Sequence, residues 1–133
     1  MAVGYSGTPL IKKLGMREGA RCSIVSEPPA YWQWLTPLPD VKVVSKGAID
    51  FAHLFVRERN VFEKQFLSLK KRLVSDGMLW VSWPKKSAKV ATDLDENIIR
   101  AFGLRHGLVD VKVCAVDEVW SGLKFVYRLE DRK

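Results

Sequence analysis

The residues best suited to hold a charged ligand lie in the stretch DGMLWVSWPKKSAKVATDLDENIIR, residues 76–100. An apolar run ends here at Pro84, and the helix that follows is predicted to begin at Thr92 or Asp93. Between them lies a short loop with three cations, Lys85, Lys86 and Lys89. Because many α/β proteins hold an anion where a strand ends beside a helix N-terminus, this loop is a candidate anion-binding site.

Residues that could do nucleophilic or metal chemistry are sparse. His53 lies in the middle of an apolar run and is predicted to be a buried, hydrogen-bonded structural residue, and His106 is predicted at a helix end or on the surface. Cys22 and Cys114 fall inside apolar runs without a CxxC or Cys/His cluster, which predicts buried free thiols. No Ser/His/Asp or Cys/His spacing is present, so we predict no catalytic residue and no metal site.

The net charge of +7 favours an acidic partner such as nucleic acid. Seven basic residues and one acid fall within residues 64–89. The bases at 70–72 end a helix that returns antiparallel to the strands, so we expect them at the opposite edge of the sheet from the lysines at 85–89. A strand of about seven residues spans roughly 23 Å. The separation disfavours one continuous track for a nucleic-acid backbone.

The length of 133 residues and the hydrophobic fraction of 47% predict one domain with a sizeable core. No apolar run approaches the roughly 20 residues that a membrane span needs, and the N-terminus lacks an apolar signal-peptide core. We therefore expect a cytoplasmic protein without membrane contact. The single domain is expected over 1–133, with 1–19 as a helical entry segment.

Apolar periodicity and chain-breaking residues predict alternating helices and strands. Helices are expected at 10–14, 30–35, 59–74 (ended by Gly77) and from about 93 to before Gly107, and strands at 21–26, 41–44, 50–56, 78–83, 109–119 and 123–129, with a turn at 120–122. Strands that alternate with helices imply an α/β fold, in which a mostly parallel sheet is covered on both faces. A C-terminal antiparallel hairpin completes the sheet.

The connection between the second and third strands is unusually short. Only residues 45–49 lie between them, whereas a right-handed parallel crossover normally needs a dozen or more residues. Three arrangements satisfy this constraint. The strand at 41–44 is a marginal edge strand, or it lies antiparallel, or the chain passes beneath the sheet nearly extended.

The segment LIKKLGMREGARCSIVS resembles the entry of class I S-adenosylmethionine-dependent methyltransferases, with a short helix, a glycine turn and the first strand. DFAHLFV, RLVSDGMLWVSW and VDVKVCAVDEVWSGLKFVYRL follow the same plan. Through GTPLIKKLG, DGMLWVSWPKKSAKVATDL and VDVKVCAVDEVWSGLKFV, the chain more closely resembles a small bacterial family of uncharacterised proteins, a domain of unknown function. The resemblance implies a three-layer, Rossmann-like (methyltransferase-like) α/β fold and brings no established activity.

The chain departs from the methyltransferase pattern where the cofactor should bind. Those enzymes follow the first strand with a glycine-rich turn, whereas this chain has SEPPAY at residues 26–31. Proline lacks a backbone donor and fixes φ, so this segment cannot replace a glycine loop. Those enzymes also carry an acid at the end of the second strand, where this chain reads VVSK at 43–46. We therefore expect no S-adenosylmethionine and no other cofactor.

If the hairpin packs as in the resembling fold, its turn lies at the same edge of the sheet as the lysine loop. The candidate ligand-binding residues are then Trp83, Lys85, Lys86, Lys89, Thr92, Asp117, Glu118, Trp120, Ser121 and Tyr5. In the alternative arrangement, Lys85 and Lys86 pair with Asp117 and Glu118 at a solvated rim. The acids at 93–96 would also repel an anion.

Three functions are compatible with these features. The leading hypothesis is a non-catalytic binding or regulatory module that uses the carboxyl edge of the sheet. The first alternative is an enzyme acting on a small anionic substrate at that edge, and the second is a nucleic-acid-binding protein. Under the leading hypothesis the partner is an anionic small molecule or another protein.

Overall fold

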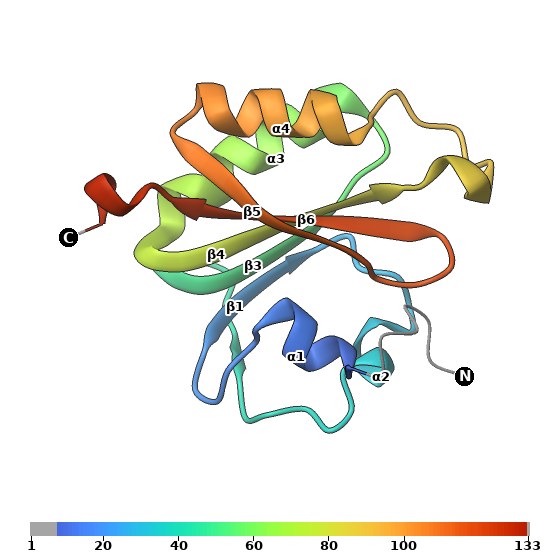
Figure 1. Cartoon of the computed structure of the whole chain (residues 1–133). Coiled ribbons are helices and arrows are strands. Elements are labelled where there is room, and N and C mark those ends of the chain that lie inside the picture. Colours follow the sequence, from blue (N-terminus) through green and yellow to red (C-terminus); the bar gives the residue numbers. More distant parts are fainter. Residues whose placement is uncertain (1–7, 133) are drawn as a thin grey trace.

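A computed structural model of the chain describes residues 8–132. Six strands form one sheet in the order β2-β1-β3-β4-β6-β5, with helices on both faces (Figure 1). The strands are β1 Arg21–Val25, β2 Lys42–Val43, β3 Ile49–Phe55, β4 Leu73–Pro84, β5 Leu108–Ala115 and β6 Trp120–Tyr127. The helices are α1 Leu10–Leu14, α2 Tyr31–Trp34, α3 Arg59–Arg72 and α4 Glu96–Arg105, with 3₁₀ turns η1 Lys86–Ala88 and η2 Leu129–Asp131.

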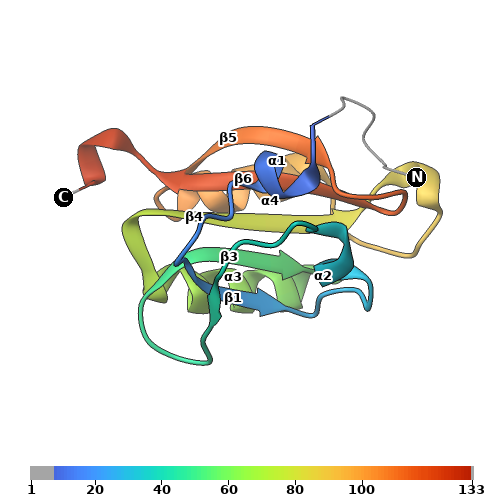
Figure 2. The same cartoon turned by 90° about the horizontal axis from the view of Figure 1, so that it is seen from below.

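The sheet is parallel from β2 to β4 and antiparallel from β4 through β6 to β5. The helices α3 and α4 cover one face, and α1 and α2 cover the other (Figures 1 and 2). This confirms the predicted three-layer α/β fold with a C-terminal antiparallel hairpin. None of the helices in residues 8–132 combines the length and apolar character that a membrane-spanning helix requires.

Two apolar cores lie on the two faces of the sheet. On the α3/α4 face, the rings of Phe62, Phe66 and Phe102 pack edge to face with centroids 5.1–5.6 Å apart. On the α1/α2 face, Phe51 and Trp80 pack beneath Leu14 and its neighbours. Because β3 contributes to both cores, six of its seven residues are buried, as the nearly continuous apolar run in the sequence predicts.

The helix α1 is held to the sheet through its C-terminal carbonyls. Trp80 Nε1 donates to the carbonyl of Leu14 at 2.8 Å, and Lys112 Nζ donates to that of Lys13 at 3.1 Å. Helix ends leave carbonyls without intrahelical partners, so these two donors satisfy groups that would otherwise need water. Gly15 ends the helix with φ of 77°, the left-handed conformation that glycine adopts without strain.

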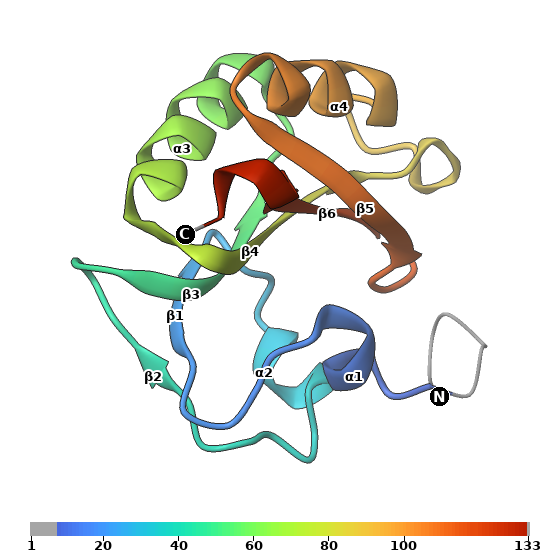
Figure 3. The same ribbon diagram turned by 60° about the vertical axis from the view of Figure 1, so that its left-hand side comes forward.

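The short connection between β2 and β3 is possible because β2 is a two-residue edge strand. It lies parallel to β1, with Lys42 opposite Arg21 and Val43 opposite Cys22 (Figure 3). On the other side of β1, Phe51 also lies opposite Cys22. The end of β2 and the first residues of β3 therefore lie at about the same level on the two sides of β1. Residues 44–48 are enough to connect them, and no crossover helix is needed.

Arg72, in the last turn of α3, binds this connection. Its Nε donates to the carbonyl of Gly47 at 2.8 Å, its Nη2 to that of Val44 at 3.2 Å, and its Nη1 to Ser23 Oγ at 3.3 Å. One planar guanidinium thus satisfies polar groups from the connection and from β1. The basic end of this helix has a structural role beyond its favourable position in the helix dipole.

The end of α3 differs from the prediction. The helix ends at Arg72 and β4 begins at once with Leu73, so Gly77 lies inside the strand and does not terminate the helix. Two steps along β3, from Ile49 to Phe51, correspond to five along β4, from Leu73 to Met78. A Cβ at Gly77 would lie 2.8 Å from Leu73 Cδ1 and 3.1 Å from the carbonyl of Asp50. Glycine therefore permits this bulge.

The hairpin turn also differs from the prediction. The strand β5 ends at Ala115 and β6 begins at Trp120, so the turn lies at 116–119 and Trp120 and Ser121 are strand residues. Asp117 holds the turn, since its Oδ1 accepts from the backbone N–H groups of Val119 and Trp120 at 2.9 and 2.8 Å. An aspartate that binds backbone groups two and three residues on is a common turn-forming element.

Replacing Arg72 with alanine should lower the free energy of unfolding by about 1–3 kcal/mol, because three acceptors lose a charged donor. Arg72→Lys should recover only part of this loss, since one ammonium cannot reproduce the guanidinium fork. Lys71→Ala, at an exposed position in the same turn, is the matched control. Urea unfolding of the three variants tests the prediction, and an Arg72→Ala protein as stable as the control would contradict it.

Candidate functional site

The exit of β1 is closed by a buried hydrogen-bond chain. After Ser26, at φ of 59°, the chain passes two prolines and enters α2, where Tyr31 is fully buried. Tyr31 Oη and His53 Nδ1 are 2.9 Å apart, and His53 Nε2 and Ser82 Oγ are 2.7 Å apart. All three side chains have no exposed surface. These hydrogen bonds link α2 to β3 and β4, the two strands at the centre of the sheet.

His53 is the central member of this chain, and its surroundings favour the neutral ring. Burial lowers the pKa of His53 to about 3. Its ring stacks on Phe55 with centroids 4.3 Å apart and meets Tyr31 edge-on. A neutral imidazole has one donor and one acceptor, which two hydroxyl groups can satisfy. The prediction that His53 is buried and hydrogen-bonded is confirmed.

The arrangement at the β1 exit does not fit the cofactor that the resemblance implies. Two of its residues, Pro28 and Pro29, have no backbone N–H, and the N–H of Tyr31 is used in a 3.0 Å bond to the carbonyl of Pro28. A glycine loop would instead direct free backbone donors towards a ligand. The short strand β2 ends at Val43 without an acid for ribose hydroxyls.

A second feature, which we call the carboxyl-edge groove, lies between the end of β4 and the first turn of α4. It has a volume of about 580 Å³, and its lining includes Trp83, Lys85, Lys86, Thr92, Leu94 and Asp95. Four of the predicted ligand-binding residues, Trp83, Lys85, Lys86 and Thr92, therefore share one concave surface. Trp83 is 6% exposed and forms an apolar wall that is continuous with the α3/α4 core.

The helix that borders the groove begins later than predicted. Asp95 is the N-cap of α4, because its Oδ1 accepts from the N–H of Ile98 at 2.8 Å. The two residues predicted to cap this helix contact the start of α3 instead. Asp93 Oδ1 accepts from the N–H of Arg59 at 2.7 Å, and Thr92 Oγ1 donates to the carbonyl of Arg57 at 2.6 Å. The loop before α4 thus caps α3 from a distance in sequence.

These contacts account for the acids that were expected to repel an anion. Asp93 and Asp95 each accept from the N-terminus of a helix, where the dipole is positive. Glu96 pairs with Arg100 one turn along α4. Within residues 8–132, no salt bridge joins Lys85 or Lys86 to an acid, so the predicted pairs with Asp117 and Glu118 are not formed. The two lysines remain the uncompensated charges of the groove.

The hairpin residues divide between the two faces of the sheet. Ser121 is paired with Trp83 and shares its face, whereas Trp120 is paired with Pro84 and lies on the other face. There the ring of Trp120 meets Phe55 edge-on, with centroids 5.1 Å apart. Trp120 therefore belongs to the wall on the α1/α2 side and does not line the groove.

The remaining predicted residues have separate positions. Asp117 supports the hairpin turn, and Glu118 is exposed within it. Lys89 has φ of 55° and ends η1, exposed to solvent. Tyr5 lies outside the described residues. Of the ten predicted residues, the structure thus brings four into the groove and places Ser121 on the same side of the sheet.

Tyr31, Ser82 and Asp95 were missed as functional or positioning residues. Tyr31 and Ser82 are far from His53 in sequence, and only the packing of α2 over adjacent strands reveals the contact. Asp95 carried a usable signal, because aspartate is among the preferred N-cap residues.

Metal and thiol chemistry find no support in the described part of the chain. No three His, Cys, Asp or Glu side chains gather there in a way that could hold a metal ion. Cys22 is buried, which raises the pKa of its thiol to about 11, and nearby Asp50 adds to the effect. Both cysteines are free, and burial also raises the pKa of Cys114.

Several solved structures share this fold. Magnesium protoporphyrin IX methyltransferase from Synechocystis PCC 6803, with bound SAH, has a TM-score of 0.59 and 11% identity, over 90% of this chain and 80% of that chain. The ribosomal protein L11 methylase from Lactobacillus delbrueckii subsp. bulgaricus has a TM-score of 0.57 and 10% identity, over 90% and 75%. A TehB-like SAM-dependent methyltransferase from Corynebacterium glutamicum has 0.57 and 9%, over 89% and 85%.

At these identities the similarity shows the fold alone. The chain has a class I methyltransferase-like, Rossmann-like fold, as its sequence resemblance implied. No family model and no curated protein sequence matches it.

The buried state of His53 predicts a specific pH dependence of stability. Its folded pKa of about 3 lies below the value of about 6.5 for an unfolded histidine. Below about pH 6.5 the unfolded chain binds a proton that the folded chain does not, so stability falls as pH falls towards 3, by up to about 1.4 kcal/mol per pH unit. Between about pH 6 and about pH 4, urea unfolding should show a steeper loss for the wild type than for His53→Gln. Parallel pH profiles would contradict the prediction.

Proposed function

We propose that this chain is a non-catalytic binding or regulatory module that keeps a methyltransferase-like fold without binding the methyltransferase cofactor. Its ligand presents a negatively charged group to Lys85 and Lys86 in the carboxyl-edge groove, and is an anionic small molecule or an acidic segment of a partner protein. In keeping with its closer sequence resemblance, the chain is a cytoplasmic member of the small bacterial family described above.

The observation that carries the proposal is the closed exit of β1. Tyr31 lies fully buried against His53 and joins the Tyr31–His53–Ser82 chain there. A cofactor in this position would have to displace Tyr31 and leave buried polar atoms without partners, which costs several kcal/mol. The architecture of the sheet is thus compatible with binding at another place on the same edge.

The composition of the groove supports recognition over catalysis. It offers an apolar wall at Trp83 and Leu94 and two lysines without an acid partner in the described residues. Among the described residues that line the groove, Thr92 supplies the hydroxyl group, and this hydroxyl already donates to the carbonyl of Arg57. Acid–base or nucleophilic catalysis needs a reactive group with a positioned base. The lining includes no His, Cys or Tyr, and its two carboxylates are engaged, Asp95 by the N–H of Ile98 and Glu96 by Arg100.

Calorimetric titration with S-adenosylmethionine should give no saturable heat at concentrations that fill a micromolar site. The reason is the closed β1 exit and its lack of backbone donors. A SAM-dependent methyltransferase of the same fold, titrated under identical conditions, is the positive control. Clear micromolar binding by this chain would overturn the proposed loss of the cofactor.

A thermal-shift screen of anionic metabolites and acidic peptides should identify a ligand that stabilises the wild type. A ligand at about 100 times its Kd adds about 2.7 kcal/mol of stability, which is readily measured. Lys85→Ala/Lys86→Ala should abolish the shift. Lys64→Ala/Lys71→Ala removes the same charge from exposed positions on α3 and should retain it. An equal loss in both variants, or no stabilising anion, would contradict the proposed site.

A further inference from the structure

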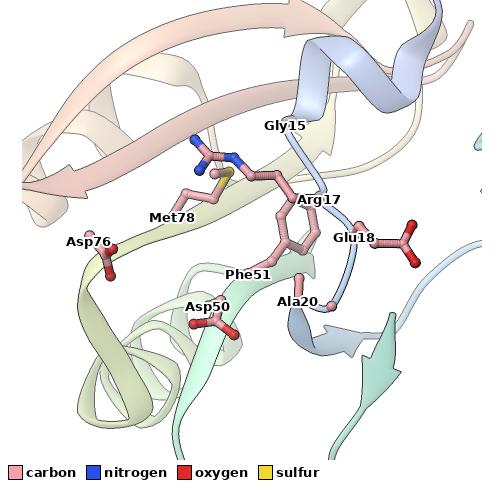
Figure 4. A pocket seen from close by; sticks show the side chains of 9 residues that line it. Gly15, Arg17, Glu18, Ala20, Asp50, Phe51, Asp76 and Met78 are labelled. Carbon is pink, nitrogen blue, oxygen red and sulfur yellow. The ribbon is translucent and has the colours of Figure 1, made fainter. Parts of the chain in front are cut away.

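A second concave surface lies at the opposite edge of the sheet, where β1, β3 and β4 begin. We call it the amino-edge cleft. It has a volume of about 190 Å³ and is lined by residues that include Gly15, Arg17, Asp50, Phe51, Asp76 and Met78 (Figure 4). Phe51 and Met78 supply apolar surface, and Arg17 extends its guanidinium over Met78 (Figure 4). The proposed groove at the carboxyl edge shares none of these residues.

Three cations from different elements lie near Gly15, of which Arg17 lines the cleft, whereas Lys112 and Lys124 are not among its lining residues. Arg17 comes from the loop between α1 and β1, Lys112 from β5 and Lys124 from β6. Lys112 and Lys124 are directly paired across the two strands. Lys124 Nζ would lie 3.8 Å from a Cβ placed on Gly15, so its ammonium group lies beside a residue that lines the cleft. Partial burial lowers the pKa of Lys124, and the charges of Lys112 and Arg17 lower it further.

The structure does not otherwise compensate these charges. Lys112 donates to the carbonyl of Lys13, and this bond holds the Lys112 ammonium group at the end of α1. Among residues 8–132, no hydrogen bond or salt bridge engages the side chains of Arg17 and Lys124. Like charges held together on a partly buried surface are unfavourable unless an opposite charge joins them.

Each of the three acids that line the cleft has a different environment. Asp50 is bound by Arg21 through three hydrogen bonds of 2.9–3.0 Å, and the side-chain bond to Arg21 is the main reason that the pKa of Asp50 is lowered. Glu18 accepts from the N–H of Asp40 and points away from the centre of the cleft (Figure 4). Asp76 lies exposed on the bulge of β4, across the cleft from Arg17 (Figure 4).

We propose that the amino-edge cleft binds a small, multiply charged anion of the phosphate class, held by Arg17 and Lys124 with Lys112 behind them. A guanidinium and an ammonium group together suit phosphate oxygens, since the first provides a planar pair of donors and the second a compact charge. The limited volume favours a phosphate or diphosphate group over a folded polymer segment. The carboxylate of Asp76 weakens binding and limits the site to ligands that carry more than one negative charge.

Calorimetric titration of the full chain with pyrophosphate at low ionic strength tests this site. Arg17→Gln should weaken binding by about tenfold, the effect expected for loss of one charge-assisted contact, and Arg17→Gln/Lys124→Gln should abolish it. Asp76→Asn should tighten binding several-fold, because it removes a like charge from the opposite wall. Lys64→Gln/Lys71→Gln, at exposed positions on α3 outside both surfaces, changes the net charge as much as the double variant and should leave pyrophosphate affinity unchanged.

The outcomes separate the proposal from its alternatives. Arg17 is exposed, so Arg17→Gln keeps the test valid even if the Lys124 variant does not fold. Equal loss of affinity in the Lys64/Lys71 control would show non-specific charge attraction and overturn the proposal. So would unchanged affinity in Arg17→Gln or Asp76→Asn. Binding of single-stranded oligonucleotides that strengthens with length, without pyrophosphate binding, would assign the cations to a nucleic acid and also overturn it.

Discussion

The hydrogen-bond chain from Tyr31 through His53 to Ser82 is the constraint on which the carboxyl edge of this protein depends. All three side chains are buried, so each needs its hydrogen-bond partner. If one moved, a neighbouring polar atom would be left without a partner in an apolar environment. The chain fixes α2 over β3 and β4 and thereby closes the exit of β1. Ligand binding at this edge, if it follows the usual location in open α/β sheets, is left to the region around β4.

A second set of contacts makes that region cationic. The loop between β4 and α4 uses Thr92 and Asp93 to bind the start of α3, while Asp95 caps α4. The acids therefore face helix N-termini and the lysines do not have acid partners within the described chain. Stability and the proposed ligand recognition thus draw on the same loop, and the capping of two helices leaves Lys85 and Lys86 uncompensated.

Much of the fold could be predicted because it follows from local patterns. Three patterns were sufficient to predict the sheet and its layers: the nearly continuous apolar run of β3, the order of elements, and the three-to-four spacing of Phe62, Phe66 and Leu69 in α3. The errors occurred where tertiary contacts override local signals. Gly77 resembles a helix terminator but relieves a close backbone approach. Asp93 resembles the cap of α4 but binds α3, which lies 34 residues earlier in sequence.

The candidate site was predictable only in part for the same reason. Lys85 and Lys86 follow a strand, and their position at its carboxyl end needs only the topology. The cations at the other edge come from segments around 17, 112 and 124, which no local motif connects. They meet because α1 is fixed above β6 by Trp80 and Lys112, and the antiparallel hairpin brings Lys112 beside Lys124. Since the twelve residues of β4 separate the two edges, the net charge of +7 is better matched to distinct anionic ligands than to one continuous phosphate track.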